Sequence, residues 1–82
     1  MAVELAPRGI RVNSVAPTFV ETSLTRPMLA DPGFRKFVMD MVPLGTVAAV
    51  EDVAAAVVFL ASPAARMITG HSLRVDGGWT AA

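Results

Sequence analysis

Residues 10–22 read IRVNSVAPTFVET, and this stretch decides the fold. Its first part, residues 10–15, is rich in β-branched and apolar side chains, which predicts a strand covered on both faces, as in a parallel sheet. Arg11 and Asn13 interrupt the apolar run. Pro17 ends the predicted strand, because proline has no N–H to donate to a strand ladder. A short polar loop that ends in a hydroxyl completes the stretch.

Three helices are predicted outside this stretch. Residues 1–6 favour helix and are stopped by Pro7 and Gly9. Asp31-Pro32 is an acidic cap followed by proline at the first helical position, so a second helix begins there. The third helix covers residues 51–61, with two acids in its first turn, where the helix dipole favours them. It is apolar nearly all round, which predicts burial on more than one side.

Residues 18–30 are ambiguous and predict a loop, with a short helix around residues 23–29 interrupted by Pro27. A second strand is predicted at residues 72–75, and Asp76-Gly77-Gly78 is a turn signal directly after it. Strand, helical connection and strand predict a βαβ unit, with two parallel strands joined by a right-handed crossover. Because two strands do not make a stable sheet alone, we expect an α/β fold in which this chain is a fragment of a doubly wound sheet.

Composition and charge exclude several classes of function. The 82 residues carry seven basic and seven acidic side chains without a basic patch, so nucleic acid is not an expected partner. The absence of cysteine excludes disulfides and thiolate metal sites and fits a cytoplasmic protein; no metal is expected. The longest apolar run, residues 53–61, is too short to span a membrane, and residues 1–4 do not resemble a signal peptide.

Hydrophobic residues make up 54% of the chain and charged residues only 17%. A small soluble domain normally shows more polar surface than this composition provides. We therefore expect several apolar faces to be covered by protein outside this chain.

Four motifs occur in a fixed order: ELAPRGIRVN at residues 4–13, FLAS at 59–62, ITG at 68–70 and VDGG at 75–78. Together they resemble the C-terminal portion of the short-chain dehydrogenase/reductase family, over essentially all of residues 1–82. The resemblance implies a Rossmann-type fold whose ligands bind at the carboxyl ends of the strands. It also implies an enzyme that transfers hydride between NAD or NADP and a secondary alcohol or ketone, with polyol, sugar and keto-acyl substrates all open.

By this resemblance, the loop after the first strand lies against the nicotinamide half of the cofactor. Pro17 and Thr18 occupy the family's Pro-Gly position, and Phe19 follows in the same loop. Val20 matches the residue whose backbone groups hold the carboxamide. Thr22 matches the hydroxyl that bonds the carboxamide or the pyrophosphate, although a loop or helix cap is its alternative role. If the family's glycine serves a positive φ, Thr18 implies strain or a shifted loop.

The substrate pocket and the chain's end are less specific. Met28 and Leu29 follow the nicotinamide loop and are candidates to line the substrate pocket, within a lid of residues 23–42. Their spacing equally fits a core position. Trp79 is expected at a subunit interface or on a neighbour's cleft, or else packed on its own subunit. His71 is expected at a solvated rim.

No catalytic residue is assigned. The family's glycine-rich phosphate loop has no counterpart here, the chain has no tyrosine, and its only lysine is Lys36. The family's Tyr-xxx-Lys pair, in which an ammonium lowers the pKa of a phenol that moves a proton, is therefore missing. We expect the isolated chain to be inactive and its parent to be a homo-oligomer, a dimer or tetramer, that assembles through helix 51–61 and strand 72–76.

Two alternatives stay open from the sequence. The chain is a non-catalytic truncated form that acts only as an oligomerisation or interaction module, which follows from its apolar excess and unpaired strand edge. In the second alternative, the truncation is an artefact and the short chain has no independent biological role.

Overall fold

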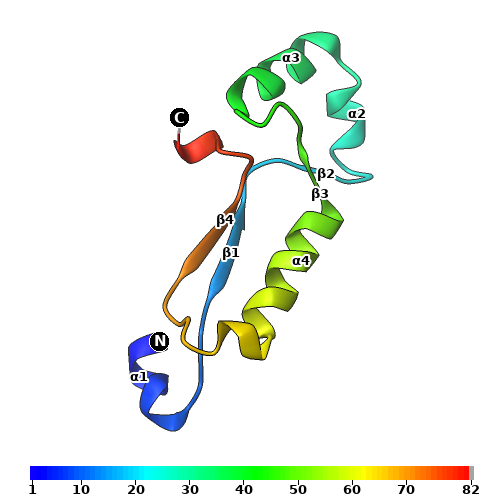
Figure 1. Cartoon of the computed structure of the whole chain (residues 1–82). Helices are drawn as coiled ribbons and strands as arrows, with labels where there is room; N and C mark the ends of the chain where they lie inside the picture. The colour runs from blue at the N-terminus through cyan, green and yellow to red at the C-terminus, as the bar shows by residue number, and fades with distance from the viewer. Residues whose placement is uncertain (82) are drawn as a thin grey trace.

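The computed structural model describes residues 1–81 and shows two small parallel sheets. In the first, β1 (Ser14–Pro17) pairs with β4 (Ser72–Val75), with Ser14 opposite Ser72 and Pro17 opposite Val75. In the second, β2 (Val20–Glu21) pairs with β3 (Ala48–Ala49). Figure 1 shows β1 and β4 side by side with a long helix beside them, which is the predicted parallel pair with a helical crossover.

The helices are α1 (Ala2–Leu5), α2 (Arg26–Leu29), α3 (Pro32–Met41) and α4 (Val50–Ala61), with 3₁₀ turns at residues 6–8, 63–65 and 79–81. The predicted start of α3 is confirmed, because the side chain of Asp31 accepts a hydrogen bond from the N–H of Gly33 at 3.1 Å. Helix α4 begins similarly, with the carboxylate of Asp52 accepting the N–H of Ala49 at 2.8 Å. Pro27 lies in the first turn of α2 rather than interrupting it, so that detail of the prediction was wrong.

The predicted strand at residues 72–75 is confirmed, whereas the bounds predicted for the first strand were wrong. The ladder begins at Ser14. Before it, residues 11–13 contact residues 68–71 through side-chain bonds and one main-chain bond, from the Gly70 N–H to the Val12 carbonyl at 2.8 Å. Thr69 Oγ1 accepts the N–H of Val12 at 3.1 Å, and the Asn13 amide donates to the Ile68 carbonyl at 2.9 Å. The oxygen of the same amide accepts the N–H of His71 at 3.0 Å. Residues 68–71 are therefore bonded to residues 12 and 13 without a regular strand pairing.

The core is small for a chain of this length. The buried cluster is formed by Leu29, Val38 and Val42, with Phe19, Phe34, Val47 and Trp79 packed against it. The Cα radius of gyration is 15.5 Å, against about 12 Å for a compact domain of this length. The surface area is 5738 Å², against about 4,700 Å² for a folded monomer of this mass.

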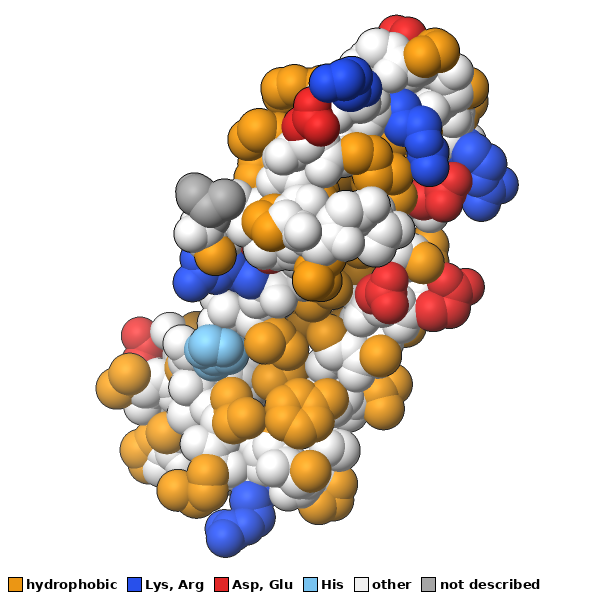
Figure 2. Space-filling view, turned by 45° about the horizontal axis from the view of Figure 1, so that its top comes forward, with side chains coloured by type: hydrophobic (Ala, Val, Ile, Leu, Met, Phe, Trp, Pro, Cys, Tyr) orange, Lys and Arg blue, Asp and Glu red, His pale blue; other side chains and the backbone are white. Residues whose placement is uncertain are grey.

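Helix α4 shows where the excess surface lies. Among its residues only Leu60 is buried, while Val57, Val58 and Phe59 are exposed. The prediction that this helix is buried on more than one side is therefore not met within residues 1–81. Figure 2 shows hydrophobic side chains spread over the lower half of the visible face. No helix among the described residues has the length and hydrophobicity needed to cross a membrane.

Candidate cofactor-binding site

The predicted site lies where β1 ends. Pro17, the last residue of β1, is opposite Val75, the last residue of β4, so both strands present their carboxyl ends at the same edge. The loop from residue 18 leaves this edge and leads through β2 to α2 (Figure 1). In open parallel α/β sheets this edge is where ligands bind.

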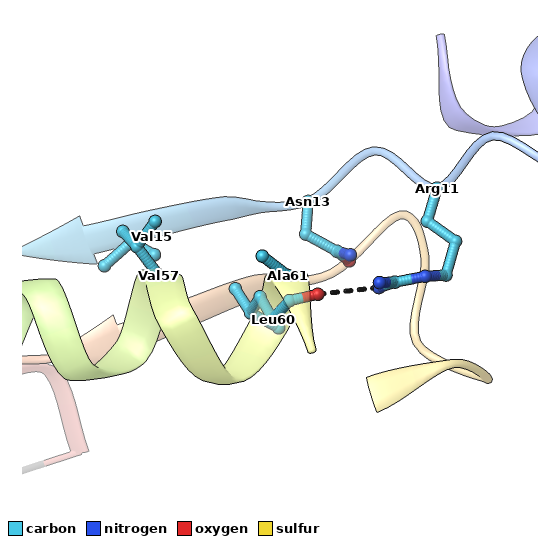
Figure 3. Close-up of a pocket in the computed structure, with 6 residues that line it drawn as sticks. All are labelled: Arg11, Asn13, Val15, Val57, Leu60 and Ala61. Atoms are coloured by element: carbon cyan, nitrogen blue, oxygen red, sulfur yellow. Dashed lines mark hydrogen bonds between the residues drawn. The ribbon is translucent and has the colours of Figure 1, made fainter. Parts of the chain in front are cut away.

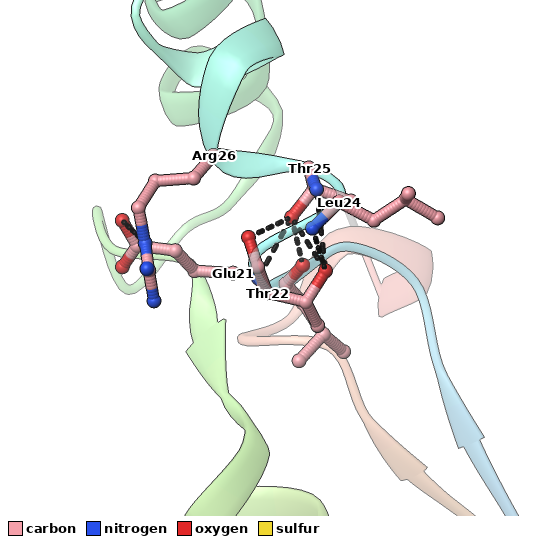
Figure 4. Close-up of polar contacts among 6 residues, drawn as sticks. Glu21, Thr22, Leu24, Thr25 and Arg26 are labelled. Carbon is pink, nitrogen blue, oxygen red and sulfur yellow. Dashed lines mark hydrogen bonds and ion pairs between the residues drawn. The ribbon is translucent and has the colours of Figure 1, made fainter.

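A pair of threonines organises the turn between β2 and α2. Thr25 Oγ1 donates to the Val20 carbonyl at 2.7 Å and accepts the N–H of Thr22 at 2.8 Å. Thr22 Oγ1 accepts the N–H groups of Leu24 and Thr25, both at 3.2 Å. Figure 4 shows these bonds on one side of the turn and the ion pair of Glu21 and Arg26 on the other side. The turn is thus closed by side-chain oxygens.

The predicted cofactor residues are contiguous but differ in exposure. Pro17 and Thr18 are exposed at the strand end, whereas Val20 and Thr22 are half-buried. Phe19 is also half-buried and its ring packs on Phe34, with 5.7 Å between centroids. The side chain of Phe19 therefore packs against the core cluster.

Thr18 carries no backbone strain. Among residues 1–81, only glycines have a positive φ. The loop therefore accommodates threonine in ordinary backbone geometry, and the expected strain at this position is absent.

The two candidate substrate residues separate in the structure. Met28 is 48% exposed on α2 and is available to a ligand. Leu29 is 3% exposed and belongs to the core cluster, which is the other role that its spacing allowed. The lid predicted over residues 23–42 consists of the turn, α2 and α3.

The end of β4 is a tight polar turn, as predicted. Asp76 accepts the N–H of Gly78 at 2.9 Å, and its other carboxylate oxygen accepts the Thr80 hydroxyl at 2.6 Å. The Thr80 hydroxyl first, and then the Gly78 N–H, lower the pKa of Asp76 below its ordinary value. The turn places Trp79 on the chain's own core, with its ring edge-on to Phe37 at 6.4 Å between centroids. His71 is exposed, as expected.

A separate hollow of about 330 Å³ lies between β1 and α4, away from the predicted loop. Figure 3 shows Val15 and Val57 at one side of it and Arg11 and Asn13 at the other. Nη1 of Arg11 donates to the Leu60 carbonyl at 2.8 Å and to the Ile68 carbonyl at 3.2 Å, so this side of the guanidinium is bound to the chain's own backbone. The described residues contain no cluster of side chains that could hold a metal ion.

Residues 1–80 match the family model described as Enoyl-(Acyl carrier protein) reductase. The chain belongs to the short-chain dehydrogenase/reductase family. It is 49% identical over 79 residues to L-xylulose reductase of Mesocricetus auratus, covering 96% of this chain and 32% of that protein.

Two solved structures of similar proteins carry nicotinamide cofactors. A 4-hydroxyisoleucine dehydrogenase complexed with NADH has a TM-score of 0.95 and 34% identity, with 100% of this chain and 34% of that chain covered. A gluconate 5-dehydrogenase from Burkholderia cenocepacia, in complex with NADP and tartrate, has a TM-score of 0.89 and 36% identity, with 100% and 32% covered. The Rossmann-type fold class is thereby confirmed. The chain spans about a third of the length of the relatives it matches.

The sequence did not predict the two bonds that the Thr25 hydroxyl forms with Val20 and Thr22. Thr22 and Thr25 are three residues apart, at a spacing that lets two side chains meet across a turn, and this was the available signal. The spacing alone does not predict these bonds, because they also depend on the direction of the Val20 carbonyl.

Proposed function

We propose that this chain is the C-terminal portion of a short-chain dehydrogenase/reductase domain, whose complete enzyme transfers hydride between NAD or NADP and a secondary alcohol or ketone. Sugars and polyols are the favoured substrates, because L-xylulose reductase and gluconate 5-dehydrogenase are among the similar proteins. The observation that carries the proposal is the loop that leaves the carboxyl end of β1, beside the end of β4, and leads through β2 to the polar turn before α2. In this kind of sheet, ligands bind at that edge.

The residues at this edge fit a nicotinamide cofactor. A carboxamide offers one acceptor and two donors, so it needs both kinds of partner. Thr22 supplies a hydroxyl and the backbone of Val20 supplies main-chain groups, while Pro17 and Thr18 are exposed at the strand end beside them. The bound dinucleotide supplies the hydride acceptor or donor. These residues of the chain hold and orient its ring, and exposed Met28 contributes to the substrate side.

The chain itself does not supply the proton transfer. It has no tyrosine and one lysine, Lys36, which pairs with Asp40 at 3.2 Å on an exposed part of α3. The proton relay and the phosphate-binding loop are therefore assigned to protein outside residues 1–82, and the chain alone is expected to be inactive.

The exposed apolar surface supports a larger assembly. The apolar side chains of α4 match the surface that the rest of a doubly wound sheet would cover. We further propose that the complete enzyme is a cytoplasmic homo-oligomer that uses helix 51–61 and strand 72–76, with a small molecule rather than nucleic acid or membrane as its ligand.

The encoding DNA tests the position of the chain within its protein. An in-frame upstream region with a glycine-rich loop after a strand and a Tyr-xxx-Lys pair is expected. A contiguous upstream region that lacks both would contradict the proposal.

The complete protein tests the activity. Purified enzyme is expected to reduce NAD or NADP in the presence of a polyol or sugar, measured by absorbance of the reduced nicotinamide. A protein that binds neither cofactor would refute the assignment.

A further inference from the structure

The turn between β2 and α2 contains two hydroxyls whose hydrogen bonds can be assigned one by one. A hydroxyl has one proton and two lone pairs. For Thr25 the shortest contact fixes the proton, because its oxygen lies 2.7 Å from the Val20 carbonyl and 3.5 Å from the Thr22 carbonyl. One of its lone pairs accepts the N–H of Thr22 at 2.8 Å.

The same assignment for Thr22 gives the opposite result. Its oxygen accepts two backbone N–H groups, from Leu24 and Thr25, so both of its lone pairs are engaged. Its proton has one partner within the turn, Thr25 Oγ1 at 3.3 Å, which is longer than an ordinary O–H···O bond. The hydroxyl of Thr22 can therefore offer a ligand a donor but no acceptor.

We propose that Thr25 is a positioning residue for the nicotinamide cofactor: it pins the carbonyl of Val20 and the N–H of Thr22 and leaves the Thr22 hydroxyl as a donor for the carboxamide oxygen. This inference rests on the proposed function, since Val20 and Thr22 meet the cofactor only if the chain is part of such an enzyme. Thr25 itself does not touch the cofactor.

The geometry explains why the hydroxyl of Thr25 is needed. Thr25 is half-buried and connects the end of β2 to the start of α2. Without its oxygen, the N–H of Thr22 and the carbonyl of Val20 lose a short partner at the same time. Both groups belong to the segment that orients the ring, so the loss falls on the nicotinamide half of the ligand and leaves the adenosine half unaffected.

The test uses the complete protein and two probes, the reduced dinucleotide and ADP-ribose, which lacks the nicotinamide. If the enzyme prefers NADP, 2′-phospho-ADP-ribose is used in place of ADP-ribose. Thr25→Val is expected to weaken dinucleotide binding about tenfold, from two hydrogen bonds of ordinary strength. Binding of ADP-ribose is expected to stay within about twofold of wild type, because it makes no contact with this turn. Isothermal titration calorimetry gives both dissociation constants.

Two variants serve as controls. Thr25→Ser keeps the hydroxyl and is expected to restore dinucleotide binding to within about twofold of wild type. Ser23→Ala removes an exposed hydroxyl from the same turn, one that forms no hydrogen bond among the described residues, and is expected to change neither constant.

Two outcomes would overturn the proposal. One is Thr25→Val binding the dinucleotide as wild type does, and the other is an equal loss for both probes, which would mean general loosening of the fold. If Thr25→Val does not fold, Thr22→Val replaces it; unchanged selectivity between the two probes in that variant would also refute the proposal. A wild-type protein that binds neither probe refutes the proposed function instead.

Discussion

Alanine at Gly77 tests how closely the end of β4 packs on the core. Gly77 has a φ of 61°, and a Cβ built on it would overlap the side chain of Val42, which is 4% exposed. The two segments cannot easily separate, because the Leu44 N–H donates to the Gly77 carbonyl at 3.1 Å. The positive φ costs alanine about 1–2 kcal/mol, and the overlap adds about 1–3 kcal/mol.

Gly45 provides the matched control. Its φ is 77°, but a Cβ there would meet nothing within 4 Å. Gly45→Ala should therefore cost only the backbone term of about 1–2 kcal/mol, whereas Gly77→Ala should cost about 2–5 kcal/mol in total. The free energy of unfolding of the complete protein, from urea titration followed by circular dichroism, measures both.

A double variant isolates the overlap. Val42→Ala removes the methyl group that Gly77→Ala would strike, so the extra cost at Gly77 should vanish in the Val42→Ala background. Equal destabilisation by Gly77→Ala and Gly45→Ala, or an extra cost that persists with Val42→Ala, would refute this account of the packing.

Three further outcomes are expected. Arg11→Met removes two hydrogen bonds that a guanidinium donates to backbone carbonyls, so it should lower the free energy of unfolding of the complete protein by about 3 kcal/mol. As a control in the same urea titration, Arg35→Met on the exposed face of α3 should lower it by less than about 0.5 kcal/mol. The pKa of Asp76 is lowered on folding, so the ionised carboxylate stabilises the fold above the unfolded pKa, and this stabilisation is lost as pH falls through the folded pKa. The difference in melting temperature between wild type and Asp76→Asn should therefore shrink below about pH 4 in pH-dependent thermal melts. The isolated 82-residue chain should bind a hydrophobic dye, because it exposes many apolar side chains. It should show no turnover, and measurable dehydrogenase activity would contradict the prediction that catalysis needs residues outside this chain.

The sequence predicted the elements whose signals are local. Helix α3 followed from Asp31-Pro32, and β4 from a short segment that ends in the turn signal Asp76-Gly77-Gly78, because capping and turn chemistry act within a few residues. Strands β2 and β3 were missed. They have two residues each, and Ala48–Ala49 has no side-chain preference for strands, so only the contact between distant segments defines them.

The candidate site divides in the same way. The resemblance supplied the loop of residues 17–22, whose assignment to the cofactor remains a prediction. The separation of Met28 from Leu29 was beyond the sequence, because adjacent residues on one short helix differ only by what packs on them. The start of β1 was misplaced because the side chain of Asn13 forms bonds that a backbone ladder would otherwise make.

The pairing of Ser14 with Ser72 has a consequence for synthesis of the protein. The two positions are 58 residues apart, the difference between 72 and 14. At about 5–20 residues per second, a ribosome needs roughly 3–12 s to make the partner of β1 after β1 itself has been made. During that interval this edge of β1 has no native neighbour, and an unpaired apolar strand invites wrong pairing. Slowed translation between the two strands should therefore lower the yield of correctly folded protein in cells, and chaperones that shield nascent chains should restore it.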